Sequence, residues 1–179
     1  MRIDRFVEAL AVIRGLLTDR VTNVAGEHYR LTEAIAEPKP VKATMPLLIG
    51  GKRPRMLGVV AEYADEWNMW ALPDVIAERR AVLDAACTDR GRDPAEIATS
   101  TQALWFIDDD QAAADAKIAE SGTPAAIGGP LDRLTETVAA WRDAGVDELI
   151  VPDFTLGRGA ERRDAMDAII ERIAPQFAD

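Results

Sequence analysis

The stretch Pro46-Leu47-Leu48-Ile49-Gly50-Gly51-Lys52-Arg53-Pro54-Arg55 decides how the rest of the chain is interpreted. A short apolar run ends in two glycines, and three cations and a helical pattern follow. This order is typical of a buried strand that leads through a turn to a helix N-terminus, where unpaired N–H groups and the helix dipole favour an anion. Glycines allow a ligand to approach the backbone closely, and proline suits the first helical turn. The alternative is a plain strand-to-helix turn with a solvated basic rim.

The composition limits the classes of partner. The chain has 179 residues, the size of one domain, which we expect to span 1–179, and its formal net charge is −10. An acidic chain lacks the basic surface that nucleic acids and anionic membranes require, so we expect neither as a partner. The sequence has no secretory signal and no apolar run near the ~20 residues of a membrane span, so we expect a cytoplasmic protein. One cysteine (Cys87, expected in the core) and one histidine (His28, expected to face solvent or to cap) predict no metal site.

Apolar periodicity predicts how the elements follow one another along the chain. Spacings of three and four predict helices over about 3–17, 54–63, 73 to a stop at Gly91, 111–120, 131 to a stop at Gly145, and 160–173. Apolar and β-branched runs predict strands over 47–50, 64–70, 98–107 and 148–152. Residues 21–45 are expected to form a small hairpin or an extended loop, and 122–129 a loop. The aspartates at 108–110 are interpreted as a helix cap in preference to a metal cluster.

Alternation of strands and helices predicts an α/β fold with a parallel sheet. Four strands fit either a doubly wound sheet or half of an eight-stranded barrel. In both architectures ligands bind at the carboxyl ends of the strands. The residues expected at that end are Gly50-Gly51, Asn68–Trp70, Asp108 and Pro152-Asp153.

The motifs resemble one known family. The segments that carry the resemblance are Arg5-Phe6, Glu8–Leu10, Ile13–Leu17, Gly26–Tyr29, Pro46–Gly51, Ala64–Asn68, Gly91–Pro94, Gly128–Pro130 and Ala144–Leu149. In this order and spacing the chain resembles the C-terminal half of the luciferase-like monooxygenases, especially the branch that uses the deazaflavin coenzyme F-420. The resemblance covers nearly the whole sequence, although no single motif would suffice alone.

The resemblance implies a (βα)8 TIM barrel of which this chain is the C-terminal half-barrel, with four parallel strands and surrounding helices. It also implies cofactor binding, of F-420 or FMN, whose phosphate would lie against the turn formed by Ile49, Gly50, Gly51 and Lys52. Asn68 and Trp70 would stand at the mouth beside the substrate. For Trp67 and Trp70 barrel packing remains the alternative, and Trp105 and Trp141 are expected in the core.

The departures from the family limit the functional prediction. Relatives place the usual catalytic groups on the first four strands, which this sequence does not contain, and His28 does not match those positions, so no catalytic residue is named. Two open sheet edges suggest that the chain is a fragment, a homo-oligomer, or one of two complementary half-barrels. The expected function is therefore a flavin- or deazaflavin-dependent oxidoreductase acting on a small organic molecule. The alternative is a non-catalytic half-barrel that binds a phosphate-bearing cofactor or a partner subunit. A third alternative is a different phosphate-binding α/β enzyme, such as an isomerase, that uses Asp108 and Asp153 as acid and base.

Overall fold

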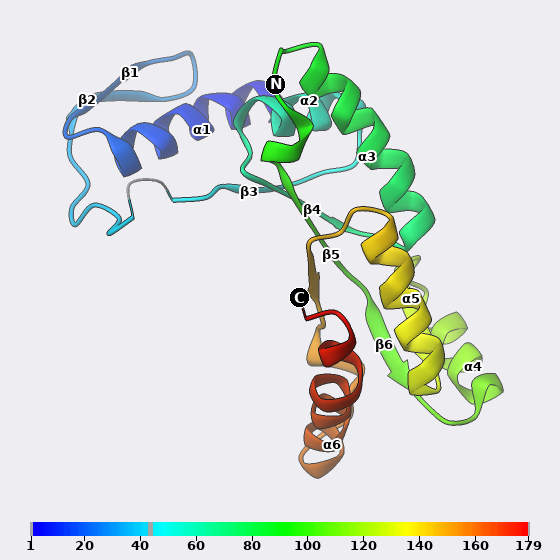
Figure 1. Cartoon of the computed structure of the whole chain (residues 1–179). Helices are drawn as coiled ribbons and strands as arrows, with labels where there is room; N and C mark the ends of the chain where they lie inside the picture. Colours follow the sequence, from blue (N-terminus) through cyan, green and yellow to red (C-terminus); the bar gives the residue numbers. More distant parts are fainter. Residues whose placement is uncertain (1, 43–44, 179) are drawn as a thin grey trace.

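A four-stranded parallel sheet organises the structure (Figure 1). The computed structural model describes residues 2–42 and 45–178. Neighbouring strands of the sheet follow the order β3 (Leu48–Gly50), β4 (Glu66–Trp70), β5 (Ala98–Gln102) and β8 (Glu148–Ile150). One row of the register runs through Gly50, Asn68, Ser100 and Glu148. The predicted α/β fold with four parallel strands is confirmed.

Helices cover one face of this sheet and leave the other open (Figure 1). The covering helices are α2 (Pro54–Tyr63), α3 (Pro73–Thr88) and α5 (Leu131–Asp143). Because successive strand residues point to opposite faces, Ile49, Trp67 and Thr99 are buried in the row beneath the helices. Leu48, one residue earlier on β3, is 51% exposed on the other face. The sheet therefore has a packed outer face and an uncovered inner face.

The remaining elements flank the sheet. Helix α1 (Arg2–Thr18) contacts α2, and β1 (Thr22–Ala25) pairs antiparallel with β2 (Arg30–Ala34), which confirms the hairpin alternative for this segment. Residues 43–44 of the predicted 21–45 segment lie outside the described residues. The C-terminal helix α6 (Ala160–Ala168) continues as a π-helical turn over Ile169–Ile173 and a short 3-10 turn over Ala174–Gln176. Among the described residues, no helix combines the length and the apolar character that crossing a bilayer requires.

Two predictions in the middle of the chain were wrong. The predicted strand 98–107 is two strands, β5 and β6 (Leu104–Ile107), and the predicted loop 122–129 contains β7 (Ala126–Gly129), which pairs with β6 in a separate two-stranded sheet. Helix α4 (Gln111–Ser121) connects β6 to β7. The split occurs because β8 ends at Ile150 and does not extend beside β6. Thr155 lies there instead: its Oγ1 accepts a hydrogen bond from the Trp105 N–H at 3.2 Å and donates one to the Trp105 carbonyl at 2.6 Å.

The glycines of β7 explain why it was interpreted as a loop. A Cβ at Gly128 would lie 2.9 Å from the Phe106 carbonyl oxygen, and Gly129 has a φ of +128°. Glycine is therefore needed for close strand approach and for the exit into α5.

Aspartates hold the amino ends of two strands in the same way. Asp65, just before β4, donates its N–H to the Leu47 carbonyl at 3.0 Å and accepts the Leu47 N–H on its carboxylate at 2.8 Å. Asp147, just before β8, makes the same pair of bonds with Thr99, at 2.8 and 2.7 Å. Each aspartate thus fixes the register with the neighbouring strand.

Arg80 connects α3 to the start of β5. Its guanidinium donates to the carbonyls of Pro94 and Ile97 at 2.7 and 2.9 Å, to Thr99 Oγ1 at 2.6 Å and to Asp84 at 2.7 Å. Pro94 belongs to the 3-10 turn Pro94–Glu96 that precedes β5. A single side chain thereby joins helix, turn and strand.

Candidate functional site

A shallow depression of about 270 Å³ lies at the carboxyl ends of β3 and β4. Its lining residues are Gly50, Gly51, Lys52, Asn68, Met69 and Trp70. The parallel register produces this grouping, because Gly50 stands opposite Asn68 and the chain continues past both strands at the same edge. The structure thus brings together every predicted cofactor- and substrate-binding residue except Ile49.

Ile49 lies next to the depression without lining it. Its side chain is 3% exposed and packs in the core beneath the helices. The alternation of a β-strand places Gly50 on the opposite, uncovered face. Ile49 could therefore meet a ligand only through its backbone.

The two glycines of the turn are required for different reasons. Neither has a positive φ. A Cβ at Gly51 would lie 2.2 Å from Met56 Cγ, so the first turn of α2 packs directly on this residue. A Cβ at Gly50 would meet only the Asn68 carbonyl oxygen, at an ordinary 3.7 Å. The fold itself needs glycine at 51 and not at 50, and the space beside Gly50 opens into the depression.

The turn is electropositive. Helix α2 begins at Pro54 with Arg53 as its N-cap residue, and no side chain caps its first-turn N–H groups. Arg55 is engaged in an ion pair with Asp4 of α1. Lys52 and Arg53 are exposed and, within residues 2–42 and 45–178, take part in no ion pair. Two cations and a helix N-terminus are therefore available to an anion at this place.

Trp67 supports the turn from beneath. It is fully buried, and its Nε1 donates to the Gly51 carbonyl oxygen at 2.7 Å. Packing is therefore the correct alternative for Trp67. Trp70 is 40% exposed at the mouth, and Trp105 and Trp141 are buried in the core as predicted.

Two residues that sequence reasoning missed orient Asn68. Its Nδ2 donates to Ser100 Oγ at 2.9 Å, and Gln102 Nε2 donates to its Oδ1 at 3.3 Å. These bonds fix which end of the amide is donor and which is acceptor. One amide N–H and one lone pair remain available beside the depression. Both residues lay inside a predicted strand, but only the register shows that they flank Asn68.

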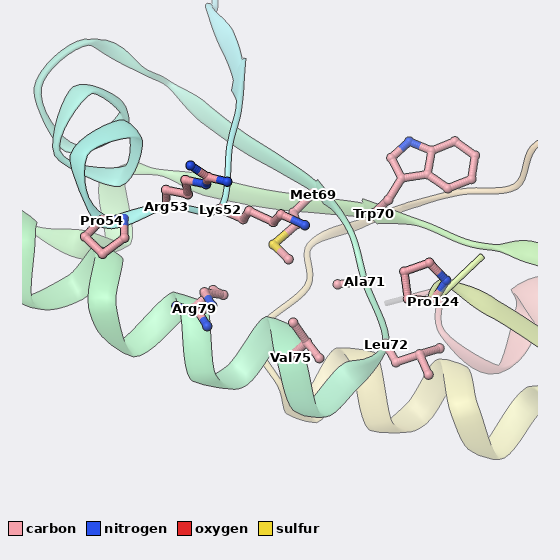
Figure 2. A pocket seen from close by; sticks show the side chains of 10 residues that line it. All are labelled: Lys52, Arg53, Pro54, Met69, Trp70, Ala71, Leu72, Val75, Arg79 and Pro124. Atoms are coloured by element: carbon pink, nitrogen blue, oxygen red, sulfur yellow. The ribbon is translucent and has the colours of Figure 1, made fainter. Parts of the chain in front are cut away.

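A second, deeper cavity adjoins the first (Figure 2). Its volume is about 330 Å³, and Lys52, Met69 and Trp70 line both. The other walls come from the start of α2, from the connection between β4 and α3, from α3 and from the segment before β7: Arg53, Pro54, Ala71, Leu72, Val75, Arg79 and Pro124. Arg79 was not singled out in the sequence, because only the packing of α3 beside the turn brings it there.

The other candidates are structural. Asp110 caps α4 by accepting the Ala112 N–H at 2.9 Å, and the hydrogen bond from Lys117 holds the pKa of Asp108 below its usual range. Asp153 pairs with Arg162 at 2.6 Å. Within the described residues no three acidic, histidine or cysteine side chains gather as metal ligands would. An acid–base pair built on Asp108 and Asp153 has no support, because each is engaged with a cation.

His28 contributes through its backbone. Its N–H donates to Glu8 Oε2 at 2.8 Å, and the N–H groups of Glu27 and Tyr29 also donate to the Glu8 carboxylate. The pKa of Glu8 is lowered, chiefly by the bond from His28. Cys87 is buried as predicted, and burial raises the pKa of its thiol.

Known proteins of similar sequence include one enzyme named for its dependence on F420 and a ketoreductase. The chain is 27% identical to the F420-dependent hydroxymycolic acid dehydrogenase of Mycobacterium tuberculosis over 64% of this chain and 32% of that protein. It is 32% identical to a phthiodiolone/phenolphthiodiolone dimycocerosates ketoreductase of Mycobacterium sp. (strain JLS) over 56% of this chain and 28% of that protein. The chain therefore matches about a third of the length of these relatives.

Solved structures show the same fold at low identity. The coenzyme F420-dependent tetrahydromethanopterin reductase of Methanopyrus kandleri superposes with a TM-score of 0.77 at 18% identity, covering 96% of this chain and 64% of that one. An F420-dependent secondary alcohol dehydrogenase, solved with an F420–acetone adduct, gives 0.77 at 16% identity, covering 97% and 61%. The sequence profile of the luciferase-like monooxygenases matches residues 1–178. With the sheet, the glycine turn and this match in agreement, the chain belongs to the luciferase-like monooxygenase family.

Proposed function

We propose that this chain carries the phosphate-binding half of a flavin- or deazaflavin-dependent oxidoreductase, with FMN or F-420 as cofactor and a small organic molecule as substrate. The observation that carries the proposal is Gly50, a glycine that the fold does not need, facing a depression at the carboxyl ends of two strands. The uncapped N-terminus of α2 and the cations Lys52 and Arg53 supply the positive charge that a phosphate requires.

The residues of the chain fit a phosphate-bearing cofactor in three ways. The backbone of Gly50 is open to close approach, Lys52 offers a point charge, and the oriented amide of Asn68 offers one donor and one acceptor. When bound, the cofactor supplies the hydride-transfer chemistry. Gly50, Lys52 and Asn68 bind and orient it, and the similarity to F420-dependent enzymes supports this choice of cofactor.

The test is to titrate the purified chain with FMN and, separately, with riboflavin, which has the same ring system without the phosphate. We expect FMN to bind at micromolar concentrations and riboflavin at least about tenfold more weakly, because charge-assisted hydrogen bonds to the phosphate are lost. A parallel titration with F-420 determines which cofactor is preferred. Equal affinity for FMN and riboflavin would show that the turn does not hold a phosphate.

A second candidate function is binding of a partner half-barrel, and the uncovered sheet face supports it. Within the four strands the uncovered positions carry Glu66 and Glu148 and no lysine or arginine. One carboxylate oxygen of Glu66, Oε1, is buried and has no hydrogen-bond partner among the described residues. Two copies of this chain would place four carboxylates inside one barrel. The charge therefore favours pairing with a half-barrel of different sequence that places a lysine or arginine opposite Glu66 and Glu148.

Charge reversal tests this candidate. The Glu66→Lys/Glu148→Lys chain, mixed with the unaltered chain, should form a one-to-one complex in sedimentation velocity, whereas each chain alone stays monomeric. The control is Glu120→Lys/Glu136→Lys, which makes the same change of charge on exposed positions of α4 and α5. A mixture that stays monomeric, or an unaltered chain that dimerises just as strongly, contradicts the role of the face.

A further inference from the structure

The second cavity concentrates positive charge in an acidic chain. Its charged lining side chains are Lys52, Arg53 and Arg79, and no acidic residue among residues 2–42 and 45–178 lines it. The net charge of the chain is −10, so three cations around one cavity form a positively charged region on an otherwise acidic protein. Figure 2 shows Arg79 on α3, across the cavity from the turn that carries Lys52 and Arg53. The cavity is therefore suited to an anion.

Arg79 has hydrogen-bonding capacity to spare. Its only ion pair within residues 2–42 and 45–178 is with Glu78, at 3.1 Å, and the Glu78 side chain is 64% exposed. Exposed pairs of this kind contribute little and exchange readily with solvent. A guanidinium has five N–H donors in a planar fork, and this geometry matches a carboxylate.

The rest of the lining is apolar. Val75 of α3 is 39% exposed, and the Met69 side chain of β4 faces it across the cavity (Figure 2). Leu72 and Pro124 complete the wall at the end away from the cations (Figure 2). Apolar side chains beside three cations give the cavity an amphipathic character. The volume of about 330 Å³ lies at the lower end of the range for small-molecule sites.

We propose that this cavity binds an organic acid, with its carboxylate at Arg79 and Arg53 and its apolar body along Val75, Leu72 and Met69. Neither the match to the family nor the names of the relatives assign this cavity. The acid is the substrate class of the enzyme if the proposed function holds, and to that extent the inference rests on it. Lys52 lines both sites, so the acid lies next to the depression assigned to the cofactor phosphate.

Calorimetric titration of the full chain with octanoate and, as the uncharged match, with 1-octanol tests the proposal. We expect octanoate to bind and octanol to bind at least about tenfold more weakly. Arg79→Gln should weaken octanoate at least about tenfold. Arg133→Gln, which removes an exposed arginine of α5, should leave its affinity unchanged. Thermal melting checks that both variants fold. We expect Arg79→Gln to fold because the Arg79 side chain is 31% exposed.

The outcomes distinguish this proposal from the proposed function. Octanoate that fails to bind, octanol that binds equally well, or Arg79→Gln without effect on octanoate overturns the acid site. Arg79→Gln that weakens FMN more than octanoate also overturns it, because the cavity then belongs to the cofactor. Loss of the FMN–riboflavin difference with octanoate binding intact instead refutes the phosphate turn and leaves the acid site standing.

Discussion

Gly50 allows the phosphate turn to be tested without disturbing the fold. Its Cβ would have a single neighbour, the Asn68 carbonyl oxygen at 3.7 Å, and its φ is accessible to any residue. Gly50→Ala should therefore change the free energy of unfolding by less than about 1 kcal/mol. Gly51→Ala is the contrasting variant, because its Cβ would fall 2.2 Å from Met56 Cγ and the methionine would have to move. Such overpacking typically costs about 1–3 kcal/mol.

The loss of FMN affinity expected for Gly50→Asp follows from the negative charge that this variant adds to the depression. Two unit charges about 4 Å apart interact by roughly 1 kcal/mol in water and roughly 4 kcal/mol at the intermediate dielectric near a protein surface. Against a bound phosphate the new carboxylate should therefore weaken affinity by roughly fivefold to several hundredfold. The turn is exposed, so we expect the lower part of this range.

Fluorescence titration with FMN measures the affinity of each variant, and urea unfolding of the same samples measures the free energy of unfolding. Gly50→Asp should lose FMN affinity while its unfolding midpoint stays near that of the unaltered chain. Raising the salt concentration should narrow the difference, since screening weakens an exposed charge. Unchanged FMN affinity in a folded Gly50→Asp chain would refute the assignment of this turn to a phosphate.

Three further predictions concern groups away from the turn. Arg80→Met should lower the free energy of unfolding by roughly 2–4 kcal/mol in urea titration, because two partly buried carbonyls and the Thr99 hydroxyl lose their donor. A change below about 0.5 kcal/mol would show that Arg80 does not hold α3 to β5. The stabilising effect of the Glu8 carboxylate is complete above its unfolded-state pKa near 4.5 and is lost as pH falls through the lower folded-state value. The urea midpoint of Glu8→Gln should therefore fall less on acidification than that of the unaltered chain. If the two midpoints fall equally with pH, the hydrogen bonds from the His28 loop to Glu8 do not stabilise the fold. The buried Cys87 thiol, its pKa raised, should react with Ellman's reagent only when guanidinium unfolds the chain, and rapid reaction in native buffer would show that the site opens.

Most of the sheet was predictable because its signals are local. The apolar run before Gly50 and the proline at 54 determined β3 and the start of α2, and glycines in the left-handed region ended helices at Gly91 and Gly145. The same signals located the depression, since strands that alternate with helices must end at the same edge.

The failures came from contacts between distant segments. Nothing local in residues 98–107 shows that β8 stops short and that Thr155 takes over beside Trp105. The glycines of β7 serve close packing, although in sequence they are also typical of a loop. Arg79, Ser100 and Gln102 remained undetected for the same reason, because their significance depends on which segments lie beside them.

The paired bonds of Asp65 and Asp147 have a consequence for how such a protein can vary. They fix strand alignment at the edge remote from the depression. The loop after β4 therefore does not have to set the alignment of β4, and its length and composition can change while the strands keep their register. Grafting a relative's loop after β4 should preserve the sheet, whereas exchanging either aspartate should disturb it. In this scaffold, alignment and recognition are controlled from opposite ends of the strands.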